Sequence, residues 1–144
     1  MKKTVIAIWG ASNQGKSSSI NEIVNRLPAH FPTAHIDIRI AGGDIQAIVT
    51  IGSVKIGIES AGDPGGRLPT SLALFVREGC EVIICATRTR GSTVTAVEAL
   101  HPQHQFDIVW TSNYCSREKP IVNSNRYFAE HMLFMLREVL AGRY

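Results

Sequence analysis

One segment constrains the fold of this chain more than any other: residues 10–17, which read Gly-Ala-Ser-Asn-Gln-Gly-Lys-Ser. Residues 3–9 precede it as a short run rich in β-branched side chains, which predicts a buried parallel strand. Residues 17–27 follow it with apolar side chains at helical spacing, and Pro28 predicts the end of that helix. The chain is therefore expected to begin with a strand, a glycine-rich turn and a helix.

The chemistry of this segment predicts a site for phosphate groups. Gly10 and Gly15 permit turns that a side chain would block, so the backbone N–H groups point inward at the N-terminus of a helix. Lys16 adds a positive charge for the β- and γ-phosphates, and the Ser17 hydroxyl is the predicted Mg²⁺ ligand. The residues expected to bind the nucleotide here are Gly10, Asn13, Gln14, Gly15, Lys16, Ser17 and Ser18.

The motif and its two flanks resemble those of the P-loop NTPase superfamily over residues 3–27. The resemblance implies one nucleotide-binding domain over residues 1–144, using ATP or GTP together with Mg²⁺. Length and composition agree with this, because 144 residues with 44% hydrophobic and 19% charged residues are ordinary for one globular domain.

Predicted strands and helices alternate along the rest of the chain. Tight turns at residues 41–44 and 52–53 join three strands into a meander, so the middle strand should run antiparallel. This order predicts an α/β three-layer fold, with a six-stranded, mostly parallel sheet, one antiparallel strand and helices on both faces. Strands are expected over residues 35–40, 45–51, 54–59, 81–86 and 106–111. Helices are expected over residues 69–78, from just after Ser92 to residue 100 before Pro102, and from a Ser124 cap to residue 141.

Two carboxylates follow the predicted strand over residues 54–59. Glu59 ends that strand and Asp63 comes directly after Gly62. The segment resembles the D-x-x-G motif of small GTPases, with Glu59 in place of Asp. The resemblance implies that Glu59 serves the metal, that the Gly62 N–H approaches the γ-phosphate and that Asp63 orients the nucleophile. The alternative is that residues 63–66 form only a turn.

Three arginines should lie at the carboxyl edge of the sheet: Arg67, Arg88 and Arg90. An arginine there can stabilise the charge that develops during phosphoryl transfer. We favour Arg88 and Arg90, because both fall in one short loop that also precedes a helix N-terminus. The alternative is that these arginines are solvated surface residues.

The segment after residue 111 bears on the choice of base. Small GTPases carry N-K-x-D in this region, whereas this chain has Asn113, Tyr114 and, in place of Asp, Ser116. A serine does not supply the paired carboxylate oxygens that guanine requires, so ATP is expected in preference to GTP. Tyr114 or Arg117 is expected either to stack on adenine or to be a plain loop residue.

Two functions remain open. The first is a Mg²⁺-dependent ATPase or kinase-like phosphotransferase for a small acceptor. The catalytic residues expected for it are Lys16, Glu59, Asp63, Arg88 and Arg90. The second is a GTPase-like nucleotide-dependent switch or binding module with slow hydrolysis. Tyr127 and Phe134 favour it, because they lie opposite the apolar face of the last predicted helix and predict a surface for a protein partner or a homodimer.

Charge and cysteine content narrow the partners and the compartment. A net charge of +3 without a basic stripe makes nucleic acid an unexpected partner. No apolar run approaches the ~18 residues of a membrane span. Three cysteines without metal-ligand spacing indicate free thiols, and therefore a cytoplasmic protein.

Overall fold

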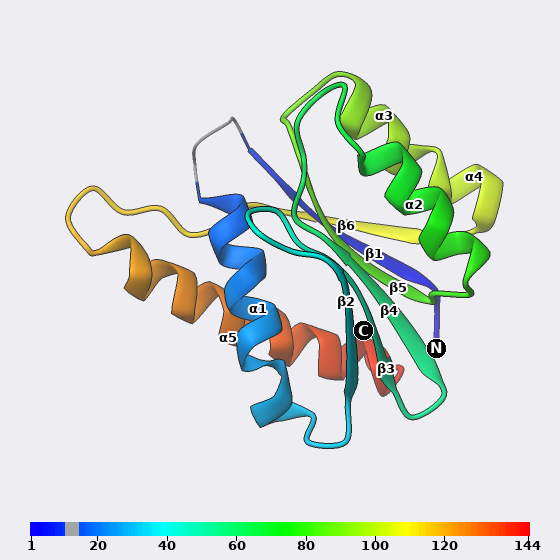
Figure 1. Cartoon of the computed structure of the whole chain (residues 1–144), viewed down its shortest axis with the longest axis horizontal. Helices are drawn as coiled ribbons and strands as arrows, with labels where there is room; N and C mark the ends of the chain where they lie inside the picture. The colour runs from blue at the N-terminus through cyan, green and yellow to red at the C-terminus, as the bar shows by residue number, and fades with distance from the viewer. Residues whose placement is uncertain (11–14) are drawn as a thin grey trace.

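The computed structural model describes residues 1–10 and 15–144, and it contains a six-stranded sheet between two layers of helices (Figure 1). The elements in chain order are β1 (Thr4–Trp9), α1 (Lys16–His30), β2 (His35–Ile40), β3 (Gln46–Ile51), β4 (Val54–Glu59), α2 (Leu68–Arg77), β5 (Val82–Thr87), α3 (Ser92–Glu98), α4 (Leu100–His104), β6 (Asp107–Thr111) and α5 (Ile121–Leu140). The α/β architecture expected from the alternation of elements is confirmed.

The strands are ordered β2-β3-β4-β5-β1-β6 across the sheet. β3 is antiparallel to both β2 and β4, whereas β4, β5, β1 and β6 are mutually parallel. The single antiparallel strand is therefore the middle strand of the predicted meander. β4 runs parallel to β1 but does not pair with it, because β5 lies between them.

Strand alternation divides the core into two parts, because successive side chains point to opposite faces of a sheet. On one face, Ile6, Ile56 and Ile58 pack with side chains of α1 and α5. On the other face, Ile83 and Cys85 pack with side chains of α2, α3 and α4. Figure 1 shows the same division, with α1 and α5 on one side of the sheet and the other helices opposite.

Three predicted helix boundaries are wrong. α1 continues through Pro28 to His30, since the proline sits in the last turn, and the Phe31 N–H still bonds to the carbonyl oxygen of Leu27. Pro102 does not stop a helix but lies in the first turn of α4, where its missing N–H would have no intrahelical partner. α5 begins at Ile121 after Pro120, so Ser124 lies one turn inside the helix and is not its cap.

Both chain ends lie at the end of the sheet opposite the one where β1 ends and α1 begins (Figure 1). Among the helices of the described residues, none combines the length and the apolar character needed to cross a membrane.

Gly57 lies where α2 approaches the sheet most closely. A Cβ atom added there would sit 2.4 Å from Cγ of the fully buried Phe75 ring. We expect Gly57→Ala to lower the free energy of unfolding by about 1–3 kcal/mol, because the ring has no room to move away. Urea denaturation would measure this loss.

A smaller side chain in place of the Phe75 ring supplies the control for Gly57→Ala. In the double variant Gly57→Ala/Phe75→Leu, the combined loss should be smaller than the sum of the two single losses, because the substitutions share one contact. A Gly57→Ala protein that unfolds at the wild-type urea concentration would contradict this close packing.

Candidate functional site

The candidate site lies at the carboxyl edge of the parallel strands, where β1 ends at Trp9 and α1 begins at Lys16. Gly10 follows β1, and its N–H donates to the carbonyl oxygen of Thr87 at the end of β5. Gly15 precedes α1 with φ of 80°, a left-handed conformation that favours glycine. Asn13 and Gln14 lie outside the described residues, so their predicted contacts stay predictions. Ser18 lies in the first turn of α1 and is exposed.

Lys16 links the start of α1 to Gly10, the residue that follows β1. Its side chain is buried, with 8% exposure, and Nζ donates to the carbonyl oxygen of Gly10 at 2.8 Å. Burial lowers the pKa of Lys16, the charge of Arg88 lowers it further, and the Asp63 carboxylate opposes both effects. Lys16, Arg88 and Asp63 therefore share one electrostatic environment, although they come from three different parts of the chain.

Arg88 and Arg90, which the sequence places in one loop, have different surroundings in the structure. Arg88 Nη2 donates to Oδ1 of Asp63 at 2.9 Å, with side-chain exposures of 30% and 75%. Arg88 Nε is buried and has no hydrogen-bond partner among the described residues. A buried donor without an acceptor is costly and uncommon in folded proteins. Arg90, two residues further on, is exposed to solvent.

Ser17 points at a carboxylate that sequence reasoning missed. Its Oγ donates to Oδ1 of Asp44 at 2.7 Å and lies 3.3 Å from the carbonyl oxygen of Ser60. Ser60 Oγ donates to the same Asp44 oxygen at 3.0 Å and accepts the N–H of Ile45. The antiparallel direction of β3 could have revealed Asp44, because the start of such a strand lies beside the carboxyl ends of its parallel neighbours.

Glu59 has a different set of partners. Its side chain is 0% exposed, and Oε1 accepts from Arg67 Nε at 2.8 Å and from Ser71 Oγ at 2.6 Å. Oε2 accepts from Arg67 Nη2 and from the Ala61 N–H, each at 3.0 Å. The same hydrogen bonds raise the pKa of Arg67. Four donors favour a structural role for Glu59, while its predicted contact with a metal stays a prediction.

The face on which Glu59 lies explains this difference. Ile56 and Ile58 point to the α1 side of β4, whereas Gly57 contacts Phe75 on the α2 side. Glu59 follows the same alternation as Gly57 and bonds to α2 through Ser71. It therefore points away from the face that carries α1 and Ser17.

Gly62 is explained by a close approach of two backbone segments. A Cβ atom at Gly62 would lie 2.7 Å from both the carbonyl carbon and the oxygen of Ala86. The loop after β4 therefore passes directly against the end of β5. The predicted contact of the Gly62 N–H with the γ-phosphate stays a prediction.

The loop after β6 meets the Gly15 turn. Asn113 is buried, and its Nδ2 lies 3.4 Å from the position that a Cβ on Gly15 would take. Oδ1 of Asn125 lies 3.8 Å from the same position and accepts from Ser19 Oγ at 2.9 Å. The segment predicted to recognise the base thus touches the segment predicted to bind phosphate.

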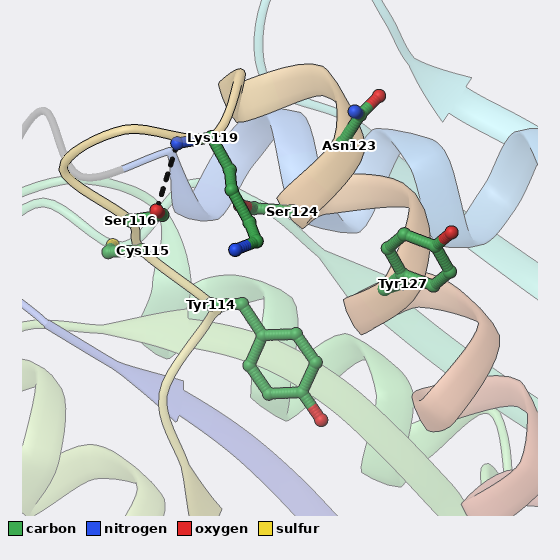
Figure 2. Close-up of a pocket in the computed structure, with 7 residues that line it drawn as sticks. All are labelled: Tyr114, Cys115, Ser116, Lys119, Asn123, Ser124 and Tyr127. Carbon is green, nitrogen blue, oxygen red and sulfur yellow. Dashed lines mark hydrogen bonds between the residues drawn. The ribbon is translucent and has the colours of Figure 1, made fainter.

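A cavity of about 610 Å³ opens beside this contact, between the loop after β6 and the first turns of α5 (Figure 2). Figure 2 shows Tyr114 on the loop and Tyr127 on α5, with the Lys119 side chain extending from the loop toward Tyr114. Its lining residues are Tyr114, Cys115, Ser116, Lys119, Asn123, Ser124 and Tyr127. The volume falls within the range of small-molecule sites.

The side chains around this cavity are held by local contacts. Ser116 Oγ accepts the N–H groups of Lys119 at 3.0 Å and Glu118 at 3.3 Å. The Tyr114 hydroxyl bonds to Nδ1 of His131 at 2.6 Å. Arg117, which the sequence suggested as a stacking residue, is exposed and does not line the cavity.

Within residues 1–10 and 15–144, no group of three or more His, Cys, Asp or Glu side chains is placed to hold a metal ion. Compared with known proteins, the chain matches no family model, and no curated protein or solved structure shows significant similarity to it. The functional interpretation therefore depends on the residues and geometry of the chain itself.

Proposed function

We propose that this chain is a P-loop protein that binds a nucleoside triphosphate with Mg²⁺, ATP in preference to GTP, and hydrolyses it or transfers its γ-phosphate. The observation that carries this proposal is the buried Arg88 Nε, which lacks a partner among the described residues while Arg88 lowers the pKa of buried Lys16. Two cations close together at the start of α1 favour the binding of an anion.

The phosphate groups would lie against the turn between Gly10 and Gly15. Backbone N–H groups at the start of α1 and the Lys16 ammonium would hold their oxygens. Phosphate oxygens would also give Arg88 Nε the acceptor that it lacks. Binding of the anion would relieve the repulsion between Lys16 and Arg88, so the site is suited to a highly charged ligand.

Magnesium fits the donors at the start of α1. The side chains there offer oxygen atoms, from the Ser17 hydroxyl and from Asp44, and Mg²⁺ is bound by such groups together with phosphates and waters. When bound, the ion would neutralise charge on the β- and γ-phosphates. A site that shares the ion with a nucleotide does not need three protein carboxylates.

The base would enter the cavity beside Tyr114. Tyr114, which lines this cavity, directly follows Asn113, and Asn113 lies against Gly15. None of its seven lining residues is Asp or Glu, and the Ser116 hydroxyl already accepts two backbone N–H groups. Guanine would therefore find no paired acceptors for its N1–H and N2–H₂ groups, which supports a preference for adenine.

Asp63 is the carboxylate best placed to act on a nucleophile. It is largely exposed and bonds to Arg88, whereas Glu59 is enclosed by Arg67 and α2. A water molecule or an acceptor hydroxyl could reach Asp63 from solvent while Arg88 stabilises the transferred phosphoryl group.

Calorimetric titration of the wild-type protein with ATP and with GTP, each with Mg²⁺, tests the proposal. We expect ATP to bind at least about tenfold more tightly than GTP, a difference of about 1.4 kcal/mol. Equal affinities would contradict the argument from the cavity lining. Absence of heat with either nucleotide would contradict nucleotide binding itself.

A nucleotide-dependent switch is the second candidate, and the outer face of α5 favours it. Tyr127 and Phe134 are exposed there, as the sequence predicts. Exposed aromatic side chains are enriched where proteins bind partners. Under this candidate, turnover would be slow and light scattering would show a homodimer, or partner binding, only in the nucleotide-loaded form.

A further inference from the structure

Asp44 reaches the start of α1 through the topology of the sheet. It lies in the turn between β2 and β3, two residues before the antiparallel strand begins at Gln46. Its position is half-buried, and it is separated from Ser17 by 27 residues in the chain. The turn between β2 and β3 thus places one carboxylate on the face of the sheet that carries α1. Glu59 points to the opposite face.

The hydrogen bonds of Asp44 leave metal-binding capacity on both residues. A hydroxyl has one proton to donate. Ser17 Oγ donates it in the 2.7 Å hydrogen bond to Asp44, so the lone pairs of Oγ remain available to a metal ion. Asp44 Oδ1 accepts from Ser17 and Ser60, whereas Oδ2 receives no hydrogen bond from a described residue. An ionised carboxylate only accepts, so Oδ2 calls for a water or a cation.

The nearby arginine does not neutralise this carboxylate. Arg67 donates from Nε and Nη2 to Glu59. Asp44 also raises the pKa of Arg67, but its contribution is the smallest of those that shift this pKa. The Asp44 carboxylate therefore lies beside the Ser17 hydroxyl without an ion pair to Arg67. This is the type of oxygen pair that binds Mg²⁺ together with waters and phosphate oxygens.

We infer that Asp44 is the metal-side carboxylate of this site: it orients the Ser17 hydroxyl, and its Oδ2 accepts from a water ligand of Mg²⁺. It takes the part that the sequence suggested for Glu59. The inference rests on the proposed nucleotide site, since the ion is shared with the phosphates.

The test compares Asp44→Asn and Asp44→Glu with the wild-type protein. Bound Mn²⁺ is measured by electron paramagnetic resonance with ATP present, and ATP affinity is measured in EDTA. We expect Asp44→Asn to weaken Mn²⁺ binding about 10–100-fold, as loss of an outer partner of a metal ligand does, while ATP affinity in EDTA changes less than about twofold. Asp37→Asn is the matched control, because Asp37 lies in the same hairpin and accepts from exposed Arg39.

The two substitutions at Asp44 separate a metal role from a structural one. A metal role needs the charge, so Asp44→Glu should bind Mn²⁺ more tightly than Asp44→Asn. A structural role needs the size and the hydrogen bonds, so it would reverse this order and overturn the inference. Mn²⁺ binding by Asp44→Asn at the wild-type level would also overturn it. A wild-type protein that binds no ATP would instead refute the proposed function.

Discussion

Replacing Lys16 by alanine is expected to weaken MgATP binding at least about 100-fold. The substitution removes a buried ammonium at the proposed phosphate site, where charged hydrogen bonds contribute more than neutral ones. The ligand-free protein should keep its thermal stability, because burial and Arg88 both disfavour the charged form of Lys16 in the fold. Calorimetry and thermal unfolding measure the two effects separately. Lys55→Ala is the control, since Lys55 is exposed at the start of β4.

The pH dependence of binding provides an internal check on this prediction. The pKa of Lys16 is lowered in the folded protein, so the ligand-free site loses a positive charge at a pH below the ordinary lysine value of about 10.4. Wild-type affinity for ATP should therefore fall as the pH rises through the lowered pKa. The free energy of unfolding should rise over the same interval, because the unfolded chain then binds more protons. A flat affinity profile up to about pH 10 would contradict the role of Lys16.

Arg88→Ala is expected to lower the rate of γ-phosphate cleavage about 10³-fold, which is the lower range for loss of a transition-state arginine. Single-turnover release of phosphate measures the rate without interference from product release. ATP affinity should also fall, because Arg88 Nε is proposed to bind the phosphates, but it should fall less than the rate, because the arginine also acts on charge that develops during the reaction.

The same loop offers a matched control for Arg88. Arg90 is exposed, whereas Arg88 bonds to Asp63 and carries the buried Nε. Arg90→Ala should leave the rate within about twofold, as expected for a solvated arginine. Equal losses in the two variants would point to a general effect of loop charge, and an unchanged rate in Arg88→Ala would remove it from the catalytic residues.

Local patterns in the sequence were sufficient to predict the layers and strand directions of the fold. Two short turns predicted the antiparallel middle strand. The insertion of β5 between β1 and β4 was not predictable in this way, because it depends on which crossover connection packs best. The proline errors have a similar origin, since the effect of proline depends on its position within a helical turn.

The candidate site was predictable only where the chain is continuous. The segment before Lys16 is local, so its motif and flanks were enough to predict a site there, whereas the partners of Ser17 and Glu59 come from distant segments. The alternation of Ile56 and Ile58 showed that Glu59 lies on the opposite face from them. It did not show which face α1 would cover. Arg88 and Arg90 differ only in burial, which two neighbouring loop residues of one type do not reveal beforehand.

The position of the chain ends has a practical consequence. Both ends lie at the end of the sheet opposite the one where β1 ends and α1 begins (Figure 1). A fluorophore, an affinity tag or a sensor surface attached to either end would therefore leave the proposed binding edge open to solvent. The protein can be immobilised by one end for surface-based kinetics, and a reporter on the other end would not obstruct the ligand.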